Sequence, residues 1–368
     1  MRTMMVSISL FVVYFLTFST YVHGQNKCEA FIDLTLIIDS SGSVSPNDFE
    51  QGKKALLDLV SRLNVATEKA GVAIINFAST PTLSAQTDVY EFERGNLFQQ
   101  IADLPRIGTN TATGDALALA DAYCQSNCRD ISKGVPRIFA IFTDGHSNEG
   151  RPAIPAAQAL RSSPVEGTIF AVGIGNIGAD GDAELLGLAG DKDYVMNIDS
   201  YLDLARVTNA ITMKMCEFPA FVGPDIKIQG EMTGNSTRYY KMHTLKKAKK
   251  NSFFEIQLND RTGKTVVYTS TTNKKPSAST SRSMTSRAVG SGNTYTTYVP
   301  ANAENFYFSV KGVSATLNQF DFTWLQMALE RETNITTELS MDGYPDLDPF
   351  QDGQKLCERV WGPLGKWL

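Results

Sequence analysis

The run Phe31-Ile-Asp-Leu-Thr-Leu-Ile-Ile38, followed directly by Asp39-Ser40-Ser41-Gly42-Ser43, decides the fold of the first half of the chain. The run is apolar and rich in β-branched residues, which is typical of a strand that is buried on both faces of a sheet. Ser45 then offers a helix N-cap and Pro46 suits the first helical position, so we predict a helix from here to about Leu63. A buried strand that leads through a short polar loop into a helix predicts an α/β fold.

Strand-like and helix-like segments continue to alternate as far as residue 215. We predict further strands at 72–77, 82–89, 136–143, 167–173 and 193–198, and helices near 92–102, 114–125, 154–161, 183–189 and 202–215. Strands that alternate with helices form a doubly wound, mainly parallel sheet. The sequence therefore predicts an α/β domain over residues 28–216.

The pattern changes after Cys216, where short alternating runs recur without convincing amphipathic helices between them. Such runs lie at 225–229, 252–258, 265–270, 295–299, 305–310 and 319–325. This pattern predicts an all-β, sandwich-like domain over residues 225–340, joined to the first domain by a linker at 217–224. The Ser/Thr-rich stretch between 270 and 297 is predicted to be a long loop, and 341–368 an acidic tail.

The first 24 residues have the features of a secretory signal peptide. An apolar core from about Val6 to Phe18 precedes Val22-His-Gly24, which suits a cleavage site. The core is too short to cross a bilayer comfortably, and no second apolar run of spanning length follows. We therefore predict a secreted, extracellular protein without a membrane span.

Composition narrows the classes of function. The 368 residues are 42% hydrophobic and 20% charged, with a formal net charge of −5. This is a globular composition, and its negative balance argues against a nucleic-acid binder. No Ser-His-Asp, Cys-His or paired-carboxylate arrangement stands out, so the sequence predicts a protein that is not an enzyme.

Oxygen-bearing side chains follow the predicted strands where the strands end. Asp39, Ser41 and Ser43 come after the first strand, Thr109 lies in a later loop, and Asp144 follows the strand at 136–143. In an open parallel sheet, the carboxyl ends of the strands form the binding edge. Hard oxygen ligands favour Mg²⁺, with Mn²⁺ or Ca²⁺ as alternatives. Turn and capping chemistry alone is the other interpretation of Asp-x-Ser-x-Ser before a helix.

Asp39-x-Ser41-x-Ser43, Thr109 and Asp144-Gly145 resemble the metal-ion-dependent adhesion site of von Willebrand factor type A domains. Gly173-Ile-Gly175 also matches that family, and the resemblance covers about residues 28–216. It implies that Ser41 and Ser43 are direct hydroxyl ligands. It also implies that Asp39 acts partly through water and Asp144 mostly through water. It implies that Thr109 responds to partner binding.

The resemblance implies a secreted adhesion or matrix protein whose metal takes an exposed Asp or Glu of an extracellular partner, for example a collagen-like protein. A second hypothesis remains open on the sequence alone. In it the chain is a structural matrix scaffold that assembles through its β-sandwich and Cys357, while the metal site is idle.

Five cysteines in a secreted chain are expected to form disulfides. Cys28 and Cys216 flank the α/β segment and are predicted to be bonded, while Cys124 and Cys128 lie one helical turn apart and could close a local loop. Other pairings remain open. Cys357 is left over, which suggests a free thiol or a disulfide-linked homo-oligomer.

Three surface features of the second half complete the sequence-based expectations. Asn235-Ser-Thr and Asn334-Ile-Thr are glycosylation sequons. A basic cluster, formed by Lys246, Lys247, Lys249 and Lys250, is a candidate for binding acidic polysaccharide, and a solvated surface is the alternative.

Overall fold

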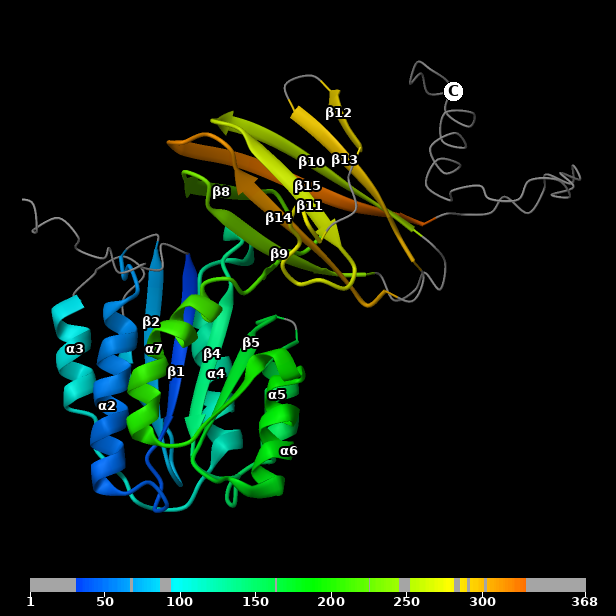
Figure 1. The fold of residues 1–368 in the computed structure, drawn as a ribbon. Coiled ribbons are helices and arrows are strands. Elements are labelled where there is room, and N and C mark those ends of the chain that lie inside the picture. The colour runs from blue at the N-terminus through cyan, green and yellow to red at the C-terminus, as the bar shows by residue number, and fades with distance from the viewer. Residues whose placement is uncertain are drawn as a thin grey trace, which may run out of the picture. The chain divides into compact units, whose positions relative to one another are not determined.

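The computed structural model describes residues 31–66, 69–86, 94–162, 164–224, 226–244, 252–280, 285–289, 292–300 and 303–328 (Figure 1). Several sequence predictions lie outside these residues: the signal peptide 1–24, the acidic tail 341–368, Cys28, Cys357, Asn334 and the basic cluster Lys246, Lys247, Lys249 and Lys250. Within the described residues, no helix is long and apolar enough to cross a membrane.

A six-stranded sheet forms the centre of the first half, with strand order β3-β2-β1-β4-β5-β6. All neighbouring strands are parallel except β3, which runs antiparallel to β2 at one edge. The strands are β1 (Ile32–Asp39), β2 (Ala70–Phe77), β3 (Thr82–Gln86), β4 (Arg137–Thr143), β5 (Thr168–Ile174) and β6 (Val195–Ile198). The predicted α/β fold with a mainly parallel sheet is confirmed.

Helices follow the strands as the alternation predicts. They are α2 (Pro46–Ser61), α3 (Arg94–Ala102), α4 (Thr113–Asn127), α5 (Ala153–Leu160), α6 (Gly178–Ala189) and α7 (Tyr201–Met215), with short 3₁₀ turns η1 (Ile131–Lys133) and η2 (Lys192–Tyr194). At the start of α2, the Ser45 hydroxyl accepts a hydrogen bond from the backbone N–H of Asp48, and Pro46 occupies the first helical position. The local cap therefore forms as its sequence indicates.

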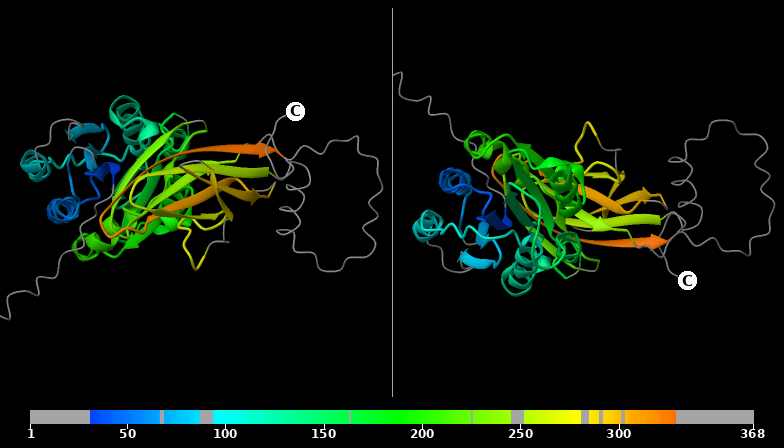
Figure 2. Two further views of the ribbon diagram at one scale, coloured as in Figure 1. Left: turned by 90° about the horizontal axis from the view of Figure 1, so that it is seen from above. Right: turned by 90° about the horizontal axis from the view of Figure 1, so that it is seen from below.

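Each face of the sheet buries its own apolar core, because successive side chains of a strand point to opposite faces. Leu34 and Leu36 of β1 lie in a cluster with side chains of α2, α3 and α7, whereas Ile37 lies in a cluster with side chains of α4, α5 and α6. The helices of the two layers can be followed by colour in Figures 1 and 2. Burial on both faces explains why the strands are continuously apolar.

The second half contains two mostly antiparallel sheets, in the orders β12-β13-β10-β15-β8 and β11-β14-β9-β7. Their strands are β7 (Ala220–Phe221), β8 (Ile228–Thr233), β9 (Thr237–His243), β10 (Ser252–Thr262), β11 (Thr265–Ser270), β12 (Thr285–Val289), β13 (Gly292–Val299), β14 (Asn305–Gly312) and β15 (Leu317–Ala328). Side chains of both sheets share one core, in which Phe254 stacks on Phe306 with ring centroids 4.6 Å apart. Additional β sheets therefore follow the α/β fold, as predicted.

Three segments of the second half differ from the sequence-based expectation. The stretch 270–297 is not one long loop, because it contains β12 and the start of β13, which pair with each other. The strand β9 was not anticipated, because its sequence Thr-Arg-Tyr-Tyr-Lys-Met-His has few apolar residues and only Tyr240 and Met242 are buried. The expected linker at 217–224 contains β7, which pairs with β9.

Two cysteines of the α/β half form a local disulfide. Cys124 in the last turn of α4 is bonded to Cys128, with 4.6 Å between their Cα atoms. Cys216 is also disulfide-bonded, and its predicted partner Cys28 is outside the described residues. Asn235 lies exposed in the turn between β8 and β9, where a sequon is accessible for modification.

Candidate metal centre

The loop that follows β1 wraps around the carboxylate at the end of that strand. The backbone N–H of Ser41 donates to Oδ1 of Asp39 at 2.8 Å. The Ser40 hydroxyl donates to the carbonyl of Phe77 at 3.0 Å, which ties the loop to the end of β2. Asp39, Ser40 and Ser41 are each at most 1% exposed, so this part of the loop is fixed in one conformation by buried hydrogen bonds.

A chain of hydroxyl groups connects this loop with the loop after β4. The Ser41 and Ser43 hydroxyl oxygens are 3.0 Å apart, and the Ser43 hydroxyl donates to Oδ1 of Asp144 at 2.7 Å. The two loops meet because β1 and β4 are parallel neighbours whose register aligns Ile38 with Phe142. The structure thus brings together four of the five predicted metal ligands, although Asp39 and Asp144 are far apart in sequence.

Thr143 was not identified from the sequence, but it holds the most buried carboxylate of the cluster. Its hydroxyl donates to Oδ2 of Asp39 at 2.6 Å and also lies 2.9 Å from the carbonyl oxygen of Gly145. Asp39 therefore receives the Ser41 N–H on one oxygen and the Thr143 hydroxyl on the other. The only sequence signal for this role is that Thr143 ends a strand directly before Asp144.

Thr109 lies beside the cluster through its backbone. Its carbonyl accepts the N–H of Gly42 at 2.7 Å, so its loop is fixed against the loop after β1. Its hydroxyl accepts the N–H of Ser79 at 3.1 Å. Within the described part of the chain, no hydrogen bond joins this hydroxyl to the other four predicted ligands. Thr109 is exposed, as is Ser43, so the cluster is open to a partner on this side.

Arg106 is a second positioning residue that the sequence did not reveal. Its guanidinium donates from Nε to the carbonyl of Val44 at 2.6 Å and from a terminal nitrogen to the carbonyl of Gly42 at 3.2 Å. These carbonyls flank Ser43, so Arg106 fixes the part of the loop that carries the exposed hydroxyl.

Burial raises the pKa of both carboxyl groups of the cluster. For Asp39 desolvation is the largest cause, and the negative charge of Asp144 adds to it. Desolvation is also the main cause for Asp144, with a further contribution from the charge of Asp48. Among the described residues, neither Asp39 nor Asp144 forms an ion pair. Two desolvated carboxylates without a cation are costly, so a cation at this point would be stabilising.

The donor set of the cluster suits a hard divalent cation. The described residues contain no group of three or more His, Cys, Asp or Glu side chains that could hold a metal. A metal bound here would therefore depend on the hydroxyls of the serines and Thr109 in addition to the two carboxylates. Carboxylate, hydroxyl and water oxygens are ligands that Mg²⁺, Mn²⁺ and Ca²⁺ accept, so the residues fit such an ion.

Comparisons with known proteins identify similar domains. The family model of the von Willebrand factor type A domain matches residues 33–210. Among curated proteins, the human collagen alpha-1(XXI) chain is 27% identical over 185 residues, which is 50% of this chain and 18% of that protein. Mouse collagen alpha-5(VI) chain is 29% identical over 52% of this chain and 7% of its own length. Mouse matrilin-2 is 27% identical over 52% of this chain and 20% of its own length.

Solved structures provide a further comparison. Proximal thread matrix protein 1 from the mussel byssus is similar to 56% of this chain over 51% of its own length, with 20% sequence identity and a TM-score of 0.44. The chain spans at most about a fifth of the curated relatives described above. The residues that the family model matches lie in the α/β half. The match of the family model identifies residues 33–210 as a von Willebrand factor type A domain.

Proposed function

We propose that Asp39, Ser41, Ser43, Thr109 and Asp144 bind one divalent metal ion, and that this site attaches the protein to an acidic side chain of an extracellular partner. The observation that carries the proposal is the continuous hydrogen-bonded chain from Asp39 and Ser41 through Ser43 to Asp144. It joins two desolvated carboxylates that have no cationic partner in the described part of the chain. We expect Mg²⁺, and Mn²⁺ or Ca²⁺ would suit the same oxygens.

Each residue has a role that follows from its contacts. Asp39 is held from both sides by the Ser41 N–H and the Thr143 hydroxyl, so its carboxylate is positioned before any ion arrives. Ser43 and Asp144 are hydrogen-bonded to each other and form the exposed side of the cluster. When bound, the divalent ion supplies an electrostatic attraction for a carboxylate of the partner. The exposed Thr109 is placed to respond to that partner, since the Ser79 N–H is the single hydrogen-bond partner of its hydroxyl among the described residues.

The proposed setting is the extracellular matrix. Support comes from the names of the relatives, which include collagen chains and matrilin-2, and from the resemblance of residues 1–24 to a signal peptide. We propose a secreted adhesion or matrix protein that binds an extracellular protein, for example a collagen-like one, and that does not act as an enzyme.

Calorimetric titration with Mg²⁺ and Mn²⁺ tests the metal site. Asp39→Asn should abolish the binding heat, whereas Asp121→Asn should not, because Asp121 lies on α4 outside the cluster and bonds to Gln125. Equal metal binding by the wild type and Asp39→Asn would show that the site assignment is wrong.

Binding of the secreted protein to an array of matrix proteins, with Mg²⁺ and again with EDTA, tests the function. Loss of binding in EDTA and in Asp39→Asn is the expected result. Binding that survives EDTA, but is lost when the four lysines of the basic cluster are changed to alanine, would instead support a scaffold whose metal site is idle.

A further inference from the structure

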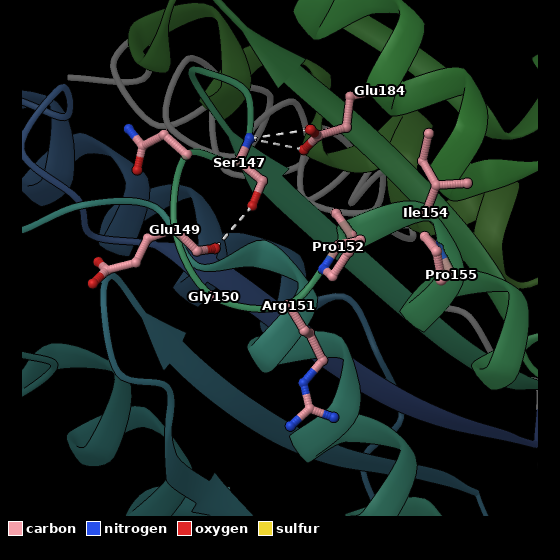
Figure 3. A pocket seen from close by; sticks show the side chains of 10 residues that line it. Ser147, Glu149, Gly150, Arg151, Pro152, Ile154, Pro155 and Glu184 are labelled. Carbon is pink, nitrogen blue, oxygen red and sulfur yellow. Dashed lines mark hydrogen bonds between the residues drawn. The ribbon is translucent and has the colours of Figure 1, made fainter.

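A shallow recess of about 440 Å³ lies beside the metal centre, in the segment that follows Asp144 (Figure 3). Its walls come from the loop between β4 and α5, the first turn of α5, and one side chain of α6. We call it the Glu184 recess and define it by Ser147, Pro152, Ile154, Pro155 and Glu184. The metal centre described above does not use any of these residues.

The loop that borders the Glu184 recess is fixed by hydrogen bonds and close packing. Oδ1 of Asn148 accepts the N–H of Thr111 at 2.9 Å, and the N–H of Asn148 donates to the Thr111 carbonyl at 3.0 Å. Gly150 has a φ of +75°, and a Cβ added there would lie 2.1 Å from Oδ2 of Asp115. The recess is therefore formed before a ligand arrives, which lowers the entropic cost of binding.

One side of the Glu184 recess is apolar. Pro152, Ile154 and Pro155 lie together on this side in Figure 3. Ile154 is 39% exposed although it packs closely over the backbone of Gly187, where an added Cβ would lie 2.6 Å from its Cδ1 atom. Because one side of Ile154 packs on Gly187 and the other side is exposed to solvent, Ile154 can contact the aliphatic part of a ligand side chain.

Glu184 presents a carboxylate to the recess, which Glu149 and Arg151 also line. Among the described residues, Glu184 forms no ion pair. Its two oxygens accept the Ser147 N–H at 3.0 and 3.1 Å, and burial raises the pKa of Glu184. The charge of His146 acts against this rise and lowers the pKa of Glu184. The guanidinium of Arg151, which lines the recess, is paired with Asp115 at 2.6 Å and points away from Glu184 in Figure 3.

Hydrogen bonds through Ser79 link the loop of the Glu184 recess to Thr109. Glu149, which lies in this loop, accepts a hydrogen bond from the Ser79 hydroxyl. The N–H of the same Ser79 donates to the Thr109 hydroxyl at 3.1 Å. A partner that reaches the exposed side of Thr109 is therefore close to the loop that borders the recess.

We propose that the Glu184 recess receives a Lys or Arg side chain of the same partner whose carboxylate binds at the metal centre. The aliphatic stem would pack on Ile154 and the prolines, and the cationic head would pair with Glu184. This proposal rests on the proposed function, and it specifies the partner further: a protein segment that carries an acidic residue and a basic residue close together.

An array of short synthetic peptides tests the proposal with the full-length protein in Mg²⁺. Each peptide carries one glutamate, and Lys, Arg, Leu or Asp is placed in turn at each neighbouring position among Gly, Ala and Ser. We expect Lys or Arg at a defined spacing to strengthen binding about tenfold over the peptide without it. Glu184→Gln should remove this preference while glutamate-dependent, EDTA-sensitive binding persists.

Reversing the charge of Glu184 distinguishes a binding role from a structural one, because a structural defect alone would not reverse the peptide preference. Glu184→Lys should shift the preference from Lys or Arg to Asp or Glu at the same spacing. Asp180→Asn is the matched control, because Asp180 is an exposed acid on the same helix that does not line the recess. It should leave the preference unchanged.

Two outcomes overturn the proposal in distinguishable ways. Glutamate peptides that bind in Mg²⁺ without any preference for Lys or Arg would refute the Glu184 recess and leave the proposed function intact. If no glutamate peptide binds in an EDTA-sensitive manner, the proposed function fails and the recess proposal fails with it.

Discussion

Two aspartates of the same strand show how the environment decides what a buried carboxylate does. Asp33 lies near the start of β1 and Asp39 at its end. Asp33 pairs with Arg129 at 2.8 Å, and the backbone N–H of Arg129 donates to its other oxygen. Asp39 is fully buried, whereas Asp33 is partly buried, and the partners of Asp39 are a backbone N–H and the Thr143 hydroxyl. Within the described residues, Asp33 has a cationic partner and Asp39 has none.

The difference teaches that a desolvated carboxylate marks a binding site only when the fold leaves it without a counter-charge. At the amino end of β1, the guanidinium of Arg129 also donates to the carbonyls of Ile32 and Lys69, so the ion pair joins several segments of the chain. At the carboxyl end, every donor to the carboxylate is neutral. The first end carries an internal ion pair, and the second end is where we propose that an external cation binds.

Breaking the internal ion pair should give the largest effect on stability. Arg129→Met leaves Asp33 buried without a counter-charge, and we expect the free energy of unfolding to fall by about 3–5 kcal/mol. Chemical denaturation measures this change. The double variant Asp33→Asn with Arg129→Met should recover part of the loss, and a loss below 1 kcal/mol in the single variant would contradict the assigned role of the pair.

Removing the Asp39 carboxylate at the carboxyl end of β1 should mainly change how the free energy of unfolding depends on metal. It should change the stability without metal much less. At a metal concentration a hundredfold above Kd, the wild type should gain about 2.7 kcal/mol of unfolding free energy, and EDTA should abolish this gain. Asp39→Asn should show no gain from metal. In EDTA its stability should stay within about 1 kcal/mol of the wild type, because no ion pair is lost. Thermal denaturation with and without Mg²⁺ measures both quantities. If metal still raised the free energy of unfolding of Asp39→Asn, the assignment of Asp39 as the carboxylate that binds the metal would be wrong.

The residue that fixes the exposed part of the loop should have a moderate effect. Arg106→Gln removes donors to the carbonyls of Val44 and Gly42, and we expect metal affinity to fall about tenfold. Calorimetric titration measures the change. Lys53→Gln is a matched control, because Lys53 also donates to a backbone carbonyl, that of Ala102 at the end of α3, away from the metal cluster. If both variants bind metal as the wild type does, Arg106 does not position the site.

The smallest effect on stability is expected for Thr109→Ala. Its side chain is exposed and accepts one hydrogen bond, so the free energy of unfolding should change by less than about 0.5 kcal/mol. Binding to matrix proteins in Mg²⁺ should nevertheless weaken, whereas the exposed control Thr272→Ala should bind normally. Unimpaired binding by Thr109→Ala would remove Thr109 from the proposed site.

Most of the α/β half could be predicted because its signals are local. The apolar run of β1, the Ser45 cap with Pro46 and the alternation of strands with helices are each contained within a few consecutive residues. The second half was harder to predict. In β9 the basic residues Arg238 and Lys241 interrupt the apolar pattern, and β12 lies in a stretch whose Ser/Thr content favours a loop. Pairing with neighbouring strands, rather than local propensity, decided both elements.

The sequence by itself determined the α/β fold of the first half and the positions of the oxygen donors, because strand ends and side-chain types are properties of short segments. Only the tertiary structure decided which donors meet and which carboxylates lack a cation. Thr143 is 104 residues from Asp39, Arg106 is 62 residues from Val44, and Arg129 is 96 residues from Asp33. No local pattern encodes contacts over such separations, because they arise where parallel strands and their loops come together at the two ends of the sheet.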